Sequence, residues 1–211
     1  MKTLAILSMT EPGSDISLAQ LVSWVRDQTS STQHATVAVP LPDSVPVAPP
    51  RGGAGTVLGV ASVWADAPVR LAPPDEFPGA RVDHLDVHED VAWDRFASGQ
   101  PRFKAMHFWS RLGHLNVQEA RARYQHHVKA TEVWGPDALA YQQNFAREDS
   151  EDRWCDGVSE LSWQNPWDML HRPAPAPEVA ELMAADTDSF LDRSTRTTLH
   201  VEERTVDRAD G

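Results

Sequence analysis

The sequence predicts an α+β fold built from two tandem ferredoxin-like βαββαβ units, with residues 1–98 in one unit and 99–211 in the other. The order strand, helix, strand, strand occurs in both halves. The offset from the first strand to its helix is also closely similar in the two halves: Thr3 to Ser17, and Phe103 to Asn116. Two such sheets commonly pack face to face or join edges as a barrel, with a cavity between sheet and helices.

The first half contains the signals for four strands and one helix. Apolar or alternating runs predict strands, and a capping box formed by Ser17 and Gln20 predicts a helix that ends near Gln28. The predicted strands are 3–9, 35–41, 56–65 and 80–91. Four prolines and three glycines in residues 42–55 predict a long loop, whose role as a lid is left open. We interpret this half as a degenerate repeat that has lost most of its second helix.

The second half contains the signals for four further strands and two helices. The strands are predicted at 102–111, 138–147, 155–164 and 196–206, and the helices at 116–134 and 177–185. Buried positions recur along the first of these helices at three- and four-residue spacing: Val117, Ala120, Tyr124, Val128 and Thr131. Asn116 and Glu119 can form a capping box at its start. His127 lies on the buried stripe, where an imidazole needs a hydrogen-bond partner or a polar cavity.

Composition narrows the classes of partner and compartment. The chain of 211 residues has 19 basic and 31 acidic side chains, which gives a formal net charge of −12. Such a surface repels phosphate backbones, so we expect no nucleic-acid partner and no membrane partner. No apolar run approaches the roughly 20 residues that cross a bilayer, and residues 1–9 are too short for a signal peptide. The single cysteine, Cys155, excludes an internal disulfide, and we expect a cytoplasmic protein.

Four segments of the second half resemble the EthD family of dimeric α+β barrel proteins in their order and spacing. They are Tyr124–Val128, Tyr141–Asn144, Asp156–Leu161 and Ala185–Asp192. The resemblance covers residues 102–206. In that family a helix carries an aromatic residue and then a histidine ahead of a proline, and His127 takes the histidine position. Lys129 stands where the proline would be, and Tyr124 lies closer to the histidine than is usual.

The resemblance implies a dimeric α+β barrel architecture within one chain, and chemistry that uses no metal and no organic cofactor. Members of the wider superfamily with known activities include lactone isomerases, polyketide cyclases and dehydratases, and oxygenases for electron-rich aromatic compounds. Their shared chemistry is proton transfer inside a mostly apolar pocket. Because single-unit relatives build the barrel from two chains, the tandem chain is expected to be a monomer or a homodimer.

The leading hypothesis is a cofactor-independent lyase, isomerase or cyclase for a small hydrophobic or aromatic substrate that bears a carbonyl, such as a polyketide intermediate. His127 would act as acid and base. Tyr124, His107 and Asn144 would orient the substrate or donate hydrogen bonds. The residues expected to bind the substrate are Trp109, Trp163, Phe145 and Glu160.

Two other functions and one structural interpretation stay open. The chain could be a cofactor-free monooxygenase, which would consume oxygen with its substrate. It could also be a non-catalytic protein that binds a small ligand or supports an oxygenase. Under the structural interpretation, His127 bonds a nearby carbonyl or carboxylate and completes the core.

Other motifs carry less chemistry. His84, Asp86 and His88 share one face of a predicted strand, but residues four apart on a strand are about 13 Å apart, so no metal site is expected. A solvated edge strand or a polar cavity lining is the favoured interpretation. Residues 51–55 lack the spacing of a phosphate-binding loop. Cys155 has no evident base partner, and hydrolase chemistry is not expected.

Overall fold

The computed structural model describes residues 1–9, 16–30, 33–42, 56–97, 100, 102–133, 138–149, 153–171 and 174–206. The strands are β1 (Lys2–Met9), β2 (His34–Pro40), β3 (Thr56–Trp64), β4 (Ala80–Asp94), β5 (Arg102–Arg111), β6 (Ala140–Ala146), β7 (Gly157–Trp163) and β8 (Leu191–Thr205). The helices are α1 (Leu18–Gln28), α2 (Val117–Val133), α3 (Pro166–Leu170) and α4 (Pro177–Asp188). Most of the predicted loop 42–55 and the predicted helix end at Trp134 lie outside the described residues.

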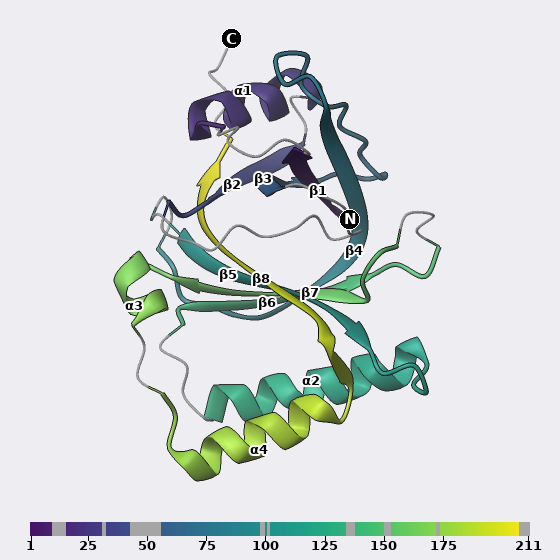
Figure 1. Ribbon diagram of the computed structural model, residues 1–211, viewed down its shortest axis with the longest axis vertical. Coiled ribbons are helices and arrows are strands. Elements are labelled where there is room, and N and C mark those ends of the chain that lie inside the picture. Colours follow the sequence, from purple (N-terminus) through teal and green to yellow (C-terminus); the bar gives the residue numbers. More distant parts are fainter. Residues whose placement is uncertain are drawn as a thin grey trace.

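The eight strands form one closed antiparallel barrel in the order β1-β3-β2-β8-β5-β7-β6-β4 (Figure 1). The prediction of an α+β fold made of tandem ferredoxin-like units was therefore wrong. Strands from both halves of the chain belong to one continuous sheet, which makes up most of the described fold. Hydrophobic periodicity reports the length and the buried face of a strand, but not which strands pair. The division of the chain at residue 98 stays a prediction.

Two long strands join the halves of the barrel. β4 pairs with β1 through residues 80–87 and with β6 through residues 87–94. β8 pairs with β5 through residues 191–203 and with β2 through residues 201–205. The first of these strands was predicted to end at residue 91 and the second to begin at residue 196. Both are longer than predicted: β4 extends its pairing with β6 to residue 94, and β8 begins its pairing with β5 at residue 191.

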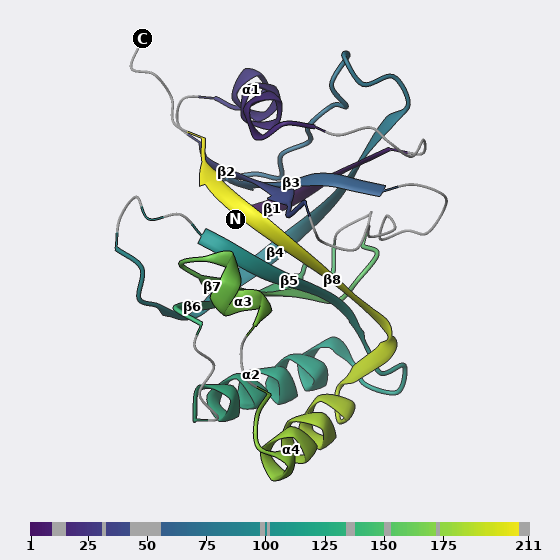
Figure 2. The ribbon, with the colours of Figure 1, turned by 60° about the vertical axis from the view of Figure 1, so that its left-hand side comes forward.

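The helices cover two opposite sides of the barrel (Figures 1 and 2). α1 packs on the outer face of the first-half strands through Leu21, Trp24 and Val25. Its predicted capping box is confirmed, because Ser17 and Gln20 exchange hydrogen bonds. α2 and α4 lie side by side on the opposite side. Within the described residues, no helix has the length and apolar character that crossing a membrane requires.

Side chains alternate between the barrel interior and the outer face along each strand. On β5, Met106 and Phe108 pack in the interior against residues such as Leu4 and Val158. Trp109 belongs instead to the outer cluster that packs against α2. This alternation decides which residues can contribute to a site beneath α2.

Candidate active site

Helix α2, on the outer face of the barrel, carries two of the predicted catalytic residues, Tyr124 and His127. Its start is fixed by reciprocal hydrogen bonds of 2.9 Å between Asn116 and Glu119, which confirms the predicted capping box. The stripe that follows is buried at Ala120, Tyr124 and His127. The predicted register of the helix is therefore the observed one.

An aromatic cluster fills the layer between α2 and the strands beneath it. The ring centroid of Tyr124 lies 4.8 Å from that of Trp109 and 5.7 Å from that of Phe145. Phe190, just before β8, closes the cluster at 5.1 Å from Tyr124. All four side chains are buried. Side chains thus occupy this part of the layer in which the sequence predicts a cavity, and two predicted substrate-binding residues, Trp109 and Phe145, lie beside Tyr124.

The hydroxyl group of Tyr124 meets two other hydroxyl groups, those of Tyr141 and Ser159. The Tyr124 hydroxyl lies 2.9 Å from the hydroxyl of Tyr141 on β6 and also contacts the hydroxyl of Ser159 on β7. Burial raises the pKa of Tyr124 and of Tyr141, because the phenolate form would lose its hydration. Both phenols are therefore protonated at neutral pH and can donate hydrogen bonds. Tyr141 and Ser159 were not among the predicted site residues, although both lie in segments quoted for the family resemblance.

His127 forms an ion-pair-like contact with a carboxylate of the neighbouring helix. Its Nδ1 lies 2.6 Å from Oδ2 of Asp186 on α4, and its ring is stacked on that of Tyr124. Burial lowers the pKa of His127, and the hydrogen bond with Asp186 opposes that shift. Assigned from this contact, the tautomer carries its proton on Nδ1 and its lone pair on Nε2. A neutral imidazole in this form can act as a base.

His107 lies on the outer face of β5, directly opposite Ser159 on β7 and Thr198 on β8. Its Nδ1 lies 2.8 Å from the Thr198 hydroxyl and 3.2 Å from Nη2 of Arg196. The structure therefore places His107 on the same face as the hydroxyl cluster. Trp163 shares that face but packs in a separate cluster, with Val128, Tyr141 and Met169 among its members.

Asn144 and Glu160 lie inside the barrel rather than beneath α2. Asn144 donates a hydrogen bond of 2.8 Å to Glu160, which also bonds Lys2 and Lys104 at 2.7 Å each. Lys104 continues the network to Glu203 at 2.5 Å. The expected position of Asn144 beneath the helix is not the position observed, because even-numbered residues of β6 face inward. The structure brings His127, Tyr124, Trp109 and Phe145 together, places His107 on the same face opposite Ser159, and separates Asn144 and Glu160 from them.

The interior network fixes the charge of its members. Burial alone would raise the pKa of Glu160, but the ammonium groups of Lys104 and Lys2 lower it to about 2. Burial would lower the pKa of Lys104, yet Glu160 and Glu203 raise it above its usual value. Glu160 and Lys104 are therefore ionised throughout the physiological pH range. A proton-transfer role requires a group that changes its charge near neutral pH, and neither residue does so.

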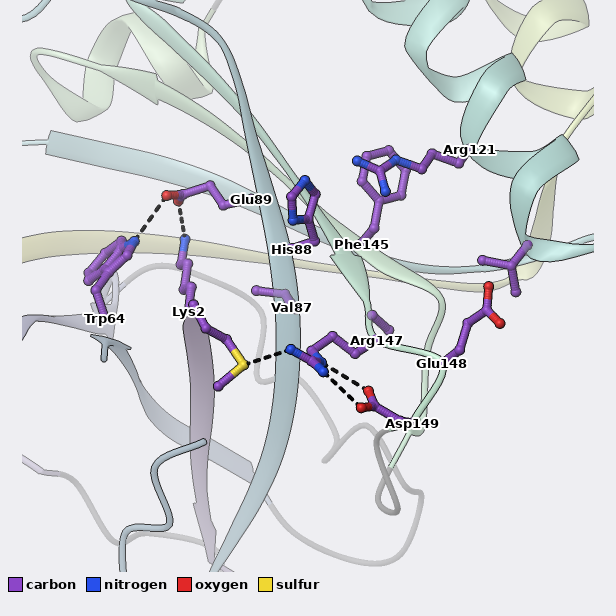
Figure 3. A pocket seen from close by; sticks show the side chains of 13 residues that line it. Lys2, Trp64, Val87, His88, Glu89, Arg121, Phe145, Arg147, Glu148 and Asp149 are labelled. Atoms are coloured by element: carbon purple, nitrogen blue, oxygen red, sulfur yellow. Dashed lines mark hydrogen bonds and ion pairs between the residues drawn. The ribbon is translucent and has the colours of Figure 1, made fainter. Parts of the chain in front are cut away.

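A pocket of about 760 Å³ opens beside the aromatic cluster (Figure 3). It lies where β4 leaves β1 and joins β6, near the first turns of α2. Its walls include Trp64, Phe145, Arg121 and His88. Phe145 also contacts Tyr124, so one side chain belongs to both the pocket and the cluster.

The strand face that carries His84 and Asp86 holds the segment before β4 in place. The Nε2 atom of His84 accepts a hydrogen bond of 2.9 Å from the backbone of Leu71, and Asp86 accepts two hydrogen bonds from Arg70. The two residues therefore anchor residues 69–71. Among the described residues, no group of three or more histidine, cysteine, aspartate or glutamate side chains is arranged to hold a metal ion.

Comparison with known proteins identifies relatives by fold. No family model and no curated protein matches the chain. The structure of an anthrone oxidase-like protein is similar, with 11% identity and a TM-score of 0.57, covering 98% of this chain and 94% of that one. A protein of Fusobacterium nucleatum, provisionally assigned as a monooxygenase, has 9% identity and a TM-score of 0.53, covering 98% and 93%. At these identities the likeness shows a shared fold.

These findings correct the leading functional hypothesis. The structural neighbours of the barrel are oxidase-like and monooxygenase-like, so the expected assignment as a lyase, isomerase or cyclase was wrong. The resemblance to the EthD family finds no support in a family model. The findings agree better with the alternative hypothesis of a monooxygenase.

Proposed function

We propose that this protein is a cofactor-free monooxygenase that oxidises an electron-rich aromatic substrate at an acidic CH₂ group, as in anthrone. The observation that carries the proposal is the contact between the buried His127, whose ring is stacked on that of Tyr124, and the partly exposed carboxylate of Asp186. The shared fold with an anthrone oxidase-like protein supports this choice of substrate class. The electrons come from the substrate itself.

The reaction begins when Nε2 of His127 removes a proton from the CH₂ group, and Asp186 stabilises the resulting imidazolium. The carbanion transfers an electron to dioxygen, and recombination forms a C–O bond and a peroxide. The imidazolium returns its proton to the peroxide. Loss of the second C–H proton and cleavage of the O–O bond then release water and leave a ketone. One oxygen atom enters the product and the other leaves as water, so no external reductant is consumed.

The hydroxyl cluster would stabilise the charge that develops on the substrate oxygen. Tyr124 and Tyr141 are protonated because burial raises the pKa of each phenol. Protonated phenols that are already in position can donate hydrogen bonds to an enolate-like oxygen, and no solvent has to reorganise. Ser159 links the two phenols to the sheet.

Access to His127 requires a shift of α4 or Phe190, because aromatic side chains close the layer. None of the residues of α4 is buried, although the helix supplies Asp186. Moving this helix therefore exposes little apolar surface and costs less than moving α2 would. We propose that α4 moves aside when the substrate enters.

Oxygen consumption with anthrone tests the proposal. After subtraction of the spontaneous rate, the wild-type protein should consume one O₂ per anthrone oxidised. His127→Ala should lower the rate about 100- to 10,000-fold, the usual contribution of a general base. His126→Ala is the matched control, because His126 is exposed on the same helix, and it should keep the wild-type rate.

Two outcomes would contradict the proposal. One is binding of anthrone without oxygen uptake above the spontaneous rate, which favours a ligand-binding protein. The other is an undiminished rate in His127→Ala while the variant still unfolds cooperatively. Because the pKa of His127 is lowered by burial, the acid limb of the rate profile should lie below the usual histidine value of 6.5. Asp186→Asn removes a contact that raises this pKa, so the limb should move to still lower pH.

A further inference from the structure

The pocket beside the aromatic cluster has two aromatic walls and several apolar ones. Trp64, the last residue of β3, and Phe145 of β6 line it, and Val87 and Ala146 are among its apolar lining residues. Figure 3 shows Phe145 and Trp64 on opposite sides of β4. At about 760 Å³ the pocket falls within the range of small-molecule sites. Its apolar lining can take a flat ring, and its charged lining residues can take a polar group on that ring.

A single carboxylate contacts two nitrogen-bearing side chains of the pocket lining, Arg121 and His88. Asp90 of β4 accepts a hydrogen bond of 3.0 Å from Arg121 and lies 3.3 Å from Nε2 of His88. Arg121 and His88 line the pocket, and the Arg121 guanidinium lies 4.7 Å from the centroid of the Phe145 ring (Figure 3). Asp90 therefore stands behind the two donors and orients them. A guanidinium has five N–H groups, so one carboxylate partner does not use them all.

The carboxylates of the pocket wall are largely engaged by cations of the same wall. Glu89 bonds Lys2 at 3.0 Å and accepts the indole N–H of Trp64 at the same distance. Asp149 is bound through both of its oxygens by Arg147. Three basic and three acidic side chains line the pocket: Lys2, Arg121, Arg147, Glu89, Glu148 and Asp149. The chain as a whole has 19 basic and 31 acidic residues. The pocket lining, with equal numbers of basic and acidic side chains, is therefore less acidic than the chain as a whole.

We propose that this pocket binds an aromatic carboxylate, with the carboxylate on Arg121 and His88 and the ring against the apolar part of the lining. A guanidinium that is already oriented can take a carboxylate through two parallel hydrogen bonds. Phe145 separates the pocket from Tyr124, so a ligand bound here lies next to the layer that contains His127. The identification of this ligand with the substrate that is oxidised rests on the proposed function. The selection of an aromatic anion by the pocket is independent of that function.

Equilibrium binding of 2-naphthoate and of the neutral 2-naphthamide, measured by calorimetry without turnover, tests the proposal. The acid should bind the wild-type protein at least tenfold more tightly than the amide. Arg121→Met should weaken naphthoate binding about 10- to 100-fold, because a charged hydrogen-bond pair is lost, and should leave the amide unaffected. His88→Gln, a change at a largely exposed side chain, should weaken naphthoate binding less and keeps the test valid if Arg121→Met fails to fold. Lys129→Met, on the exposed face of α2, should bind like wild type.

Equal affinity for the acid and the amide, no measurable naphthoate binding by wild type, or full binding by Arg121→Met and His88→Gln would overturn the proposal. His127→Ala should bind naphthoate like wild type, because His127 does not line the pocket. If naphthoate binding depends on Arg121 but no substrate causes oxygen uptake, the proposed oxygenase function is refuted and the proposed binding site stands. Oxygen uptake without such binding would refute the site and leave the oxygenase.

Discussion

The two faces of β5, β6 and β7 carry different chemistry on the same strands. The outer face holds the hydroxyl and aromatic cluster around Ser159, Tyr141 and Trp109. The inner face holds the ions Lys104 and Glu160. Ser159 and Glu160 are adjacent in sequence, yet one contacts Tyr124 and the other faces two lysines. A step of one residue along a strand thus separates a neutral hydroxyl group beneath α2 from a buried ion inside the barrel.

The inner ions form a chain that crosses the barrel. It runs from Glu89 on β4 to Lys2 on β1, Glu160 on β7, Lys104 on β5 and Glu203 on β8. The Lys2–Glu160 pair joins a strand of the first half to a strand of the second. Buried charges are tolerated only while each keeps its partners. We therefore expect substitutions on the inner face to reduce stability and substitutions on the outer face to reduce activity.

Removing the central carboxylate should give the largest loss of stability. Glu160→Gln leaves two buried ammonium groups without their shared carboxylate, and should lower the free energy of unfolding by about 3–5 kcal/mol. Urea denaturation measures this change. Glu202→Gln removes a carboxylate that pairs with the exposed Arg204 and should cost less than about 1 kcal/mol. Equal urea midpoints for the two variants would show that the inner chain does not stabilise the barrel.

The same residue predicts how stability depends on pH. The pKa of Glu160 falls from 4.5 to about 2 on folding, so the ionised form stabilises the protein above the unfolded value. That contribution is lost as the pH falls from about 4.5 towards 2. The wild-type protein should therefore lose stability in this window faster than Glu160→Gln does. Parallel acid unfolding curves for the wild-type protein and Glu160→Gln would show that Glu160 is not the source of this pH dependence.

Packing on the outer face should have a smaller effect. Gly157 of β7 pairs with Trp109, and a Cβ atom there would collide with the Trp109 ring, 2.8 Å from its Cε2 atom, and would lie 2.9 Å from the carbonyl oxygen of Asn144. Gly157→Ala should lower the free energy of unfolding by about 1–3 kcal/mol, because neither the indole nor the backbone can move far. Gly113→Ala is the control, since no atom lies within 4 Å of the added methyl group. A Gly157→Ala variant as stable as Gly113→Ala would mean that the cluster is loosely packed.

The smallest effect is spectroscopic. The chain has two tyrosines, Tyr124 and Tyr141, and both belong to the buried cluster. Because burial raises both pKa values, near-ultraviolet titration should show less phenolate at pH 10 in the folded protein than in the unfolded protein. Unfolding in urea should restore an ordinary titration, and Tyr124→Phe should halve its amplitude. Ionisation of the folded protein at the ordinary pKa would show that water reaches the cluster.

Local signals in the sequence were sufficient for α2 and for the face that it buries. The Asn116–Glu119 capping box and the stripe through Tyr124 fixed the helix register. The stripe also predicted that His127 is buried and needs a partner. The partner, Asp186, lies 59 positions away on α4, so helical periodicity could not supply it. It does fall in the segment 185–192 that resembles the EthD family.

Properties that depend on strand pairing could not be obtained from one strand at a time. Asn144 was expected beneath α2, but a shift of one residue in strand phase moves a side chain to the opposite face. The closure of the barrel depends on β4 and β8 reaching a second partner, which leaves no periodic signal. The five-residue helix α3, capped by Asn165, is too short to show a helical period. Distant pairing, rather than local propensity, decided each of these features.

Oxidation of anthrone under ¹⁸O₂, followed by mass spectrometry of the product, tests the central claim most directly. The proposed chemistry places one labelled oxygen atom in the new ketone and the other in water. The wild-type protein and His126→Ala should form the labelled product, whereas His127→Ala should not exceed the spontaneous reaction. An unlabelled product, or equal rates of labelled product from His127→Ala and His126→Ala, would contradict the assignment of His127 as the base of an oxygenase.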